Sequence, residues 1–224
     1  MNIWTEHRSR VAKRTPRSAD SFAALTDDSG SVKTATPAPY PRELEHVATL
    51  DGGARVFVRP IRPDDEPGLV DLYSRLSEHT AYQRFFTLMR RLPSTWSHFF
   101  ANVDYRCRLA LVAVHEAPSG PELIGVGRYE PTGEQGVAEI ALVVQDGWQG
   151  RGLGTVLLDD IVSAANARGV RRFRAFVLAD NYRMLRLLAN RAEIVERGIE
   201  DGVVAVVFTA RRDDAPRAAA TPGS

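Results

Sequence analysis

The stretch VVQDGWQGRGLGT at residues 143–155 decides how we interpret this chain. The apolar residues 137–144 predict a strand, and the residues after Gly150 predict a helix that runs to Arg168. Between the two, glycines stand at every second position from Gly150 to Gly154. The sequence therefore predicts a strand that turns tightly into a helix with a glycine-rich first turn.

Such a helix start is a natural anion site. The first amides of a helix have no partner within the helix and lie at the positive end of its dipole. Glycines remove the Cβ atoms that would keep a diphosphate away from those amides. We therefore interpret residues 149–155 as a diphosphate site. The alternative is a helix start whose glycines serve packing alone.

Three phosphate-binding patterns compete for this stretch. The P-loop needs Gly-Lys-Ser/Thr, a triplet that does not occur in the chain. The dinucleotide fingerprint needs Gly-x-Gly-x-x-Gly, whereas here the pattern is Gly-x-Gly-x-Gly followed by Thr155. The third pattern, Gln/Arg-x-x-Gly-x-Gly/Ala, is matched by Gln149, Gly152 and Gly154. The third pattern is the one that fits.

Outward from this stretch, alternation and helical spacing predict a mixed α/β domain. Turn residues separate three consecutive strand-like runs, which favours an antiparallel meander, and the strand–helix–strand unit that follows implies one parallel pair. The predicted strands cover 56–61, 109–115, 123–129, 137–144, 173–178 and 203–209, and the predicted helices begin at Pro63, Pro93, Gly150 and Asn181. The expected fold class is α/β (α+β mixed): a central, mostly antiparallel mixed sheet of roughly six or seven strands flanked by about four helices.

Composition narrows the classes of function. With 44% hydrophobic and 25% charged residues among 224, and a net charge of +1, the chain has the make-up of a soluble globular protein, and nothing favours nucleic acid or a membrane as partner. The single cysteine, Cys107, excludes an intrachain disulfide, is interpreted as a small buried apolar residue, and favours a cytoplasmic location.

The two ends of the chain differ from its middle in composition. Residues 1–44 and 213–224 are poor in large apolar side chains, so we predict disordered tails on either side of a domain at 45–212. The basic residues between Arg8 and Arg17 could contact an anionic partner, although a solvated tail is the simpler interpretation.

On these motifs, residues 55–211 resemble the GNAT superfamily of acetyl-CoA-dependent N-acetyltransferases. Three segments resemble bacterial protein-lysine acetyltransferases more narrowly: residues 76–86, with Ser77-Glu78-His79-Thr80 and Arg84-Phe85-Phe86, then Ala138-Glu139-Ile140-Ala141 and Ala179-Asp180-Asn181.

The resemblance implies where acetyl-CoA binds. Strand 137–144 is expected to splay from strand 173–178, leaving a V-shaped gap for the pantetheine arm. Asn181 matches a position that contacts this arm, and its alternative role is that of a helix N-cap. The backbone partners implied for the arm are Leu142, Val143 and Val144, and those implied for the diphosphate are Gln149, Gly150, Arg151, Gly152, Leu153, Gly154 and Thr155.

Glu139 is the candidate general base. A free lysine amine has a pKa near 10.4, so deprotonating it at pH 7 costs about 4–5 kcal/mol, and a carboxylate beside the amine can accept the proton. Glu139 interrupts an otherwise apolar strand and matches the glutamate that the resembled enzymes are thought to use. The alternative is a solvent-facing or ion-paired Glu. An N–H of Val143 or Val144 is the candidate donor to the oxyanion.

One position departs from the family pattern. Many GNAT enzymes carry a tyrosine as acid for the leaving thiolate, but the matching residue here is Leu188, and Tyr182 lies elsewhere on the same predicted helix. The thiolate is left without an evident side-chain acid.

The expected activity is acetyl transfer from acetyl-CoA to a primary amine, with a protein lysine as the leading acceptor. The alternatives are a small-molecule amine acetyltransferase and a non-catalytic acyl-CoA-binding module. We expect no metal, since His79, His98 and His115 lie on separate elements without ligand spacing.

Overall fold

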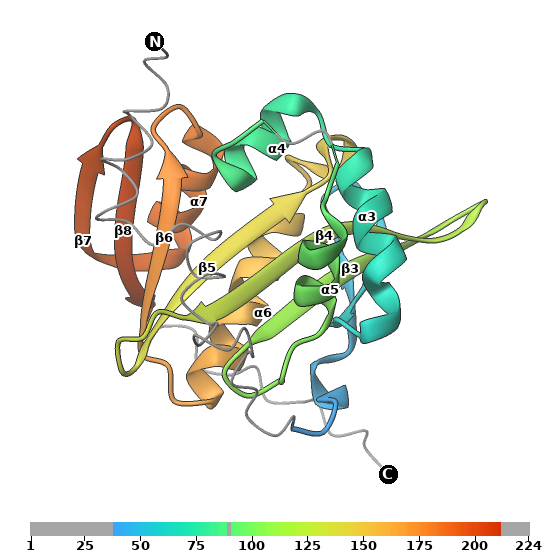
Figure 1. Cartoon of the computed structure of the whole chain (residues 1–224), viewed down its shortest axis with the longest axis horizontal. Coiled ribbons are helices and arrows are strands. Elements are labelled where there is room, and N and C mark those ends of the chain that lie inside the picture. Colours follow the sequence, from blue (N-terminus) through green and yellow to red (C-terminus); the bar gives the residue numbers. More distant parts are fainter. Residues whose placement is uncertain (1–37, 89–90, 212–224) are drawn as a thin grey trace.

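The computed structural model describes residues 38–88 and 91–211. Their centre is one eight-stranded sheet in the order β1-β2-β3-β4-β5-β6-β8-β7, in which only the β5–β6 pair is parallel (Figure 1). The predicted tails fall mostly outside the described residues. Residues 38–44 are described, and they contact the domain through Tyr40, which donates hydrogen bonds to Glu45 and to the carbonyl of Pro60.

The elements follow the predicted order. The strands are β1 (His46–Thr49), β2 (Arg55–Pro60), β3 (Leu109–Ala117), β4 (Gly120–Pro131), β5 (Val137–Val144), β6 (Arg172–Leu178), β7 (Ala192–Glu200) and β8 (Val203–Ala210). The α-helices are α3 (Glu66–Ser74), α4 (Glu78–Phe85), α5 (Ser94–Ala101), α6 (Leu153–Ala167) and α7 (Tyr182–Arg191), with short 3-10 turns η1 (Arg42–Leu44), η2 (Pro63–Asp65) and η3 (Asp146–Trp148).

Helices cover both faces of the sheet, and each face has its own apolar core (Figure 1). On one face, α3 and α5 pack their apolar sides on β3 and β4, with Leu69, Leu72 and Phe100 buried. On the other face, α6 supplies Leu157 and Ile161 to a core that extends to β6 and β8. Successive strand residues point to opposite faces, so alternation along β5 divides its side chains between the two cores.

Strands β5 and β6 separate partway along their length. Parallel pairing joins them only from Val137 to Glu139, opposite Arg172 to Arg174. Beyond that point β5 continues to Val144 paired only with β4, while β6 continues to Leu178 paired only with β8. In Figure 1 the two strands diverge, and α4 lies near the open end. The predicted V-shaped gap is therefore present in the backbone.

The register decides which backbone groups of β5 face this gap. The Gln145 N–H donates to the Ile124 carbonyl on the β4 side, so odd-numbered residues of β5 bond to β4. The N–H and C=O groups of Leu142 and Val144 therefore point into the gap, and those of Val143 do not. Of the three residues predicted to pair with a ligand's arm, two offer their backbone to it.

The fold class is confirmed, and three differences concern detail. The sheet has one strand more than the upper prediction, because the short β1 carries too little pattern to be recognised. Helix α4 was quoted as a motif but not assigned as a helix, and β7, whose side chains are almost all exposed, lacks apolar alternation. The prediction that Cys107 is buried was wrong, because the residue lies exposed in the turn before β3.

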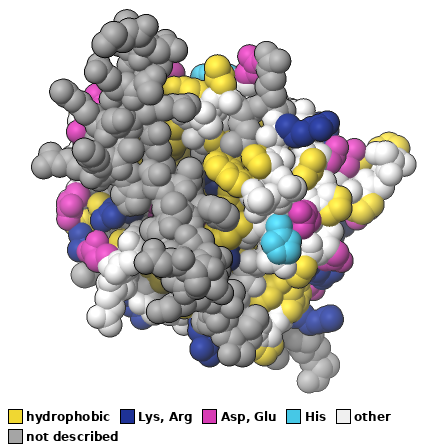
Figure 2. All heavy atoms as spheres, in the orientation of Figure 1, with side chains coloured by type: hydrophobic (Ala, Val, Ile, Leu, Met, Phe, Trp, Pro, Cys, Tyr) yellow, Lys and Arg dark blue, Asp and Glu magenta, His cyan; other side chains and the backbone are white. Residues whose placement is uncertain are grey.

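No helix among the described residues has the length and apolar character needed to span a bilayer. On the face shown in Figure 2, acidic and basic side chains of the described residues intermingle rather than forming a field of one sign. The described residues visible on this face thus offer no broad electrostatic footprint for a polyanion.

Candidate functional site

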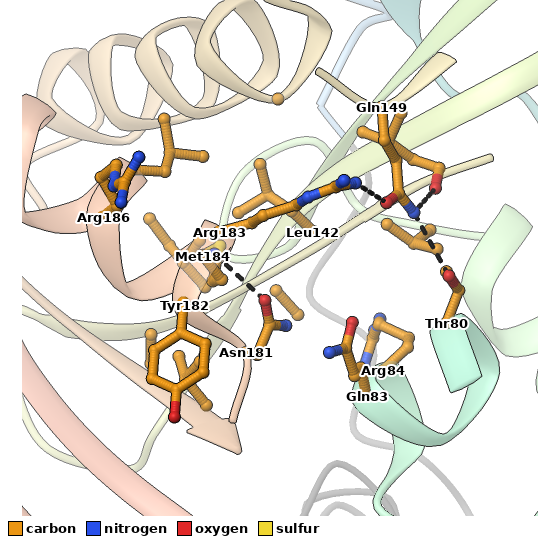
Figure 3. Close-up of a pocket in the computed structure, with 18 of the residues that line it drawn as sticks. Thr80, Gln83, Arg84, Leu142, Gln149, Asn181, Tyr182, Arg183, Met184 and Arg186 are labelled. Carbon is orange, nitrogen blue, oxygen red and sulfur yellow. Dashed lines mark hydrogen bonds between the residues drawn. The ribbon is translucent and has the colours of Figure 1, made fainter. Parts of the chain in front are cut away.

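A cavity of about 920 Å³ occupies the gap between β5 and β6. Its walls come from β5, β6, α4, α7 and the glycine turn before α6 (Figure 3). Most of the predicted site residues lie on it: Glu139, Leu142, Val143, Val144, Gln149, Gly150, Gly152, Gly154, Thr155 and Asn181. Residues that are 42 positions apart in the sequence, Glu139 and Asn181, are therefore brought to one site.

The glycine turn contains two glycines in left-handed backbone conformation. Gly150 and Gly152 have φ angles of 73° and 87°, a region in which side chains with a Cβ are strained. Gly152 is the N-cap of α6 and makes no side-chain cap hydrogen bond. The start of a 15-residue helix therefore opens on the cavity without a side-chain cap.

Two predicted members of the turn do not line the cavity. The side chain of Leu153 is fully buried in the core under α6, and that of Arg151 lies over the Trp148 ring, 5.2 Å from its centroid. The Thr155 N–H donates to the Gly152 carbonyl at 3.0 Å, so this amide already has a partner. What the turn can offer an anion is its backbone nearest Gly150 and Gly152.

Gln149 links three walls of the cavity. Its Nε2 donates to the Val144 carbonyl at 3.0 Å and to the Thr80 hydroxyl at 3.2 Å, and its Oε1 accepts from Arg183 at 2.9 Å (Figure 3). The side chain therefore holds β5, α4 and α7 together. The sequence motif identified this position, but the bracing role follows from partners that no local pattern reveals.

Asn181 is the N-cap of α7, the alternative role considered for it. Its Oδ1 accepts from the Met184 N–H at 3.1 Å (Figure 3). The residue also lines the cavity, and the same geometry leaves its amide nitrogen on that side available as a donor. The cap and a ligand contact are compatible.

Glu139 lies at the inner end of the cavity, where β5 and β6 still pair. Burial raises its pKa to about 7, against the lowering effect of Arg84 and with a further increase from the charge of Glu130. The charged groups around it are Arg84 on α4, Glu130 and Arg128 on β4, and Arg174 on β6. A carboxyl that titrates near neutral pH inside a cleft can accept a proton during a reaction at that pH.

Glu130, directly opposite Glu139 in the register, has a different environment. It accepts a hydrogen bond from Arg108 at 2.7 Å and is ion-paired with Arg128. Burial opposes its ionisation, but these two guanidinium groups outweigh that effect and lower the pKa of Glu130. Arg128 and Arg108 also lie over the rings of Phe100 and Phe99. Glu130 is thus a fully paired ion in the core.

Helix α4 is fixed at its start by Asp146. One carboxylate oxygen accepts from the hydroxyls of Ser77 and Thr80 at 2.6 and 2.7 Å, and the other accepts the Ser77 N–H at 2.9 Å. Burial opposes ionisation of Asp146, but these bonds outweigh it and lower its pKa. Because Asp146 begins the turn η3, the helix that walls the cavity is anchored beside the glycine turn.

The other side chains considered from the sequence lie in the core, on the surface or on the wall of the cavity. Leu188 is buried in the core, whereas Tyr182 is exposed on the first turn of α7 and lines the cavity. His115 packs on Trp148 and His98 lies beside Glu66 on the surface, while His79 lines the cavity from α4. Within residues 38–88 and 91–211, no three His, Cys, Asp or Glu side chains form a group that could hold a metal ion.

Fold and cleft together are typical of one class of acyltransferase, in which two parallel strands splay apart beside a glycine-rich helix start. Residues 71–191 match the model of the Acetyltransferase (GNAT) family, and the chain belongs to this family. It is therefore an enzyme of the acetyltransferase type.

Individual relatives agree with this assignment. The chain is 30% identical over 156 residues to the acetyltransferase PA5475 of Pseudomonas aeruginosa, covering 69% of this chain and 83% of the relative. It is 32% identical over 137 residues to the acetyltransferase Pat of Mycolicibacterium smegmatis, which spans 61% of this chain but only 40% of Pat. The GNAT domain of S. lividans PAT superposes with a TM-score of 0.69 at 36% identity, covering 76% of this chain and 99% of that domain.

Proposed function

We propose that the protein transfers an acetyl group from acetyl-CoA to the amine of a protein lysine, with Glu139 as general base. The observation that carries the proposal is the cavity with a glycine-rich helix start at one end and a carboxyl of pKa about 7 at the other. Similarity to Pat and to the PAT domain supports a protein acceptor.

The donor is held by backbone groups. Amides near Gly150 and Gly152 donate to the diphosphate at the positive end of α6, where no Cβ blocks the approach to Gly150. The pantetheine arm pairs with Leu142 and Val144, whose backbone groups point into the gap. The Val144 carbonyl is already bonded to Gln149, so its N–H is the group left for a ligand.

The chemistry follows from what lies beside the thioester. Glu139 removes the proton from the incoming amine, directly or through one water, and a donor beside the carbonyl stabilises the oxyanion that forms. Of the two candidates for this donor, the Val143 N–H bonds to β4, and the Val144 N–H points into the gap, where it can serve either the arm or the oxyanion but not both. The C–S bond then breaks and CoA leaves as the thiolate. Leu188 supplies no proton to it.

The test is a transfer assay with two acceptor classes. Purified protein is incubated with labelled acetyl-CoA and either a cell lysate or a panel of small amines. A reaction without protein measures non-enzymatic acetylation, and Glu139→Gln is run in parallel to test the base. We expect label on lysines of specific proteins with the wild type only. Label confined to small molecules contradicts the protein acceptor, and equal labelling by the variant contradicts the role of Glu139.

A further inference from the structure

Arg84 is a buried charged residue of the cavity that the reaction above does not use. It lies on the last turn of α4, its residue is 8% exposed, and it nevertheless lines the cavity. Figure 3 shows it beside Gln83 on the α4 side, with Asn181 on the opposite side. A buried guanidinium facing a ligand cavity is costly unless an anion compensates its charge.

No carboxylate among the described residues forms an ion pair with Arg84. Tyr73, Glu139 and Glu130 act on its charge through space, but neither glutamate forms a salt bridge with it. Glu130 is already paired with Arg108 and Arg128, and Arg174 pairs with Glu134 at 3.2 Å. Burial is the main reason that the pKa of Arg84 is lowered.

The cluster at the inner end of the cavity therefore carries surplus positive charge. Three guanidinium groups, Arg84, Arg108 and Arg128, face two carboxyls, Glu130 and Glu139, and burial favours the neutral form of Glu139. The ring contacts of Arg108 and Arg128 with α5 keep these two in place. Arg84 is the cation left to meet an anion from outside.

The position of Arg84 along the cavity indicates which part of a ligand it meets. Asp146 fixes the start of α4 beside the glycine turn, and Thr80, one turn before Arg84, bonds to Gln149. Arg84 and Glu139 are close enough to act on each other's charge, so Arg84 lies toward the Glu139 end of the cavity. This is the end where the acyl group and the acceptor amine meet.

We infer that Arg84 binds a carboxylate presented beside the reacting carbon, either on a dicarboxylic acyl group such as succinyl or on the acceptor amine itself. The planar guanidinium can donate two parallel hydrogen bonds to a carboxylate, and burial strengthens them. The inference rests on the proposed acyl transfer and goes beyond its acetyl group and its protein lysine, neither of which carries a carboxylate beside the reacting carbon.

The acyl arm of the test compares succinyl-CoA with acetyl-CoA. Turnover with one shared amine and binding by calorimetry are measured for the wild type, Arg84→Met, Arg84→Lys and Arg186→Met. Arg186 is exposed on α7 at the same cavity and serves as the control for losing a positive charge there. Thermal unfolding of each variant checks that it is folded.

The acceptor arm uses acetyl-CoA with amino acids and their α-carboxamides as matched pairs. In one of the two arms we expect the wild type to favour the carboxylate by roughly 10- to 100-fold, the range of a hydrogen bond to a charged group. Arg84→Met should abolish that ratio, Arg84→Lys should keep part of it, and Arg186→Met should leave it unchanged. The arm in which the ratio appears identifies the source of the carboxylate.

Two results overturn the inference. One is a wild type without carboxylate preference in either arm. The other is an Arg84→Met variant that shifts the pH dependence of all substrates alike and keeps the ratio, which would make Arg84 a charge that tunes Glu139 only. Failure of the proposed function can be distinguished from failure of this inference. No turnover with any substrate pair would refute acyl transfer, while calorimetry with the two acyl-CoAs would still measure whether Arg84 favours the acyl group that carries a carboxylate.

Discussion

Two glutamates face each other across β4 and β5 and have opposite environments. Glu130 is bonded by Arg108 and Arg128, and its pKa is lowered. Glu139, its neighbour in the register, forms no ion pair within the described residues, and burial raises its pKa to about 7. The partners of a buried carboxylate, rather than its depth, decide whether it holds the fold together or is available to react.

Removing the unpaired carboxylate should have the largest effect, and it should fall on the rate. We expect Glu139→Gln to lower kcat by roughly 100- to 10,000-fold, the contribution typical of a general base. Wild-type activity should rise with pH through about 7, because the base must be deprotonated. Steady-state assays from pH 5.5 to 9 check both. Full activity of the variant, or a wild-type activity that does not change with pH, would contradict the contrast drawn between Glu139 and Glu130.

Removing the paired carboxylate should instead affect the fold. Glu130→Gln leaves two buried guanidinium groups without their counter-charge, and we expect a loss of about 3–5 kcal/mol in the free energy of unfolding. Urea denaturation at pH 7.5 measures it. A matched Glu130→Asp variant, which keeps the charge, should recover part of the loss. Equal stability of the Gln variant and the wild type would contradict the pairing.

The stability of Glu139→Gln should depend on pH in a defined direction. A raised carboxyl pKa means that the folded state binds its proton more tightly than the unfolded chain, so the wild type loses stability as pH rises from about 4.5 and levels off above about 7. The variant escapes this loss. Relative to the wild type, we expect it to gain up to about 3 kcal/mol between pH 4.5 and pH 8.

Urea denaturation of both proteins at several pH values measures that difference. A difference that stays constant with pH would show that Glu139 titrates at its ordinary pKa.

Arg84→Met should give the smallest effect, an increase in stability. The methionine side chain fills similar space without a buried charge, and we expect a gain of about 1–2 kcal/mol in the free energy of unfolding. Lower stability than the wild type would indicate that an internal partner compensates the charge of Arg84. Gln83→Met, on the same helix, is the control for the change in apolar content.

Much of this architecture is readable from the sequence because local patterns carry it. The bounds of β5 were predicted to the residue, and α6 begins at the expected glycines, because apolar runs and φ-specific glycines act locally. The strand β1 and the helix α4 were not predicted. A four-residue edge strand and a polar eight-residue helix depend on tertiary partners for their structure.

The sequence predicted which residues line the candidate site, but it did not predict which of its charged groups are paired. That Glu139 lies in the gap followed from the motif. Its lack of an ion pair depends on Arg128 pairing with Glu130 and Arg174 pairing with Glu134, which no local pattern encodes. The role of Arg84 likewise depends on where α4 is anchored. The end of α7 is a further case: Ala192 continues directly into β7 in extended conformation, so the helix ends without a glycine.

The bond between Asp146 and the start of α4 has a consequence for the order of events. The same residue belongs to the turn that leads into the helix of the donor site and to the support of the wall that carries Arg84. A nucleotide bound at that turn would stabilise both the turn and α4. We therefore expect the donor to bind before the acceptor, in an ordered sequential kinetic mechanism.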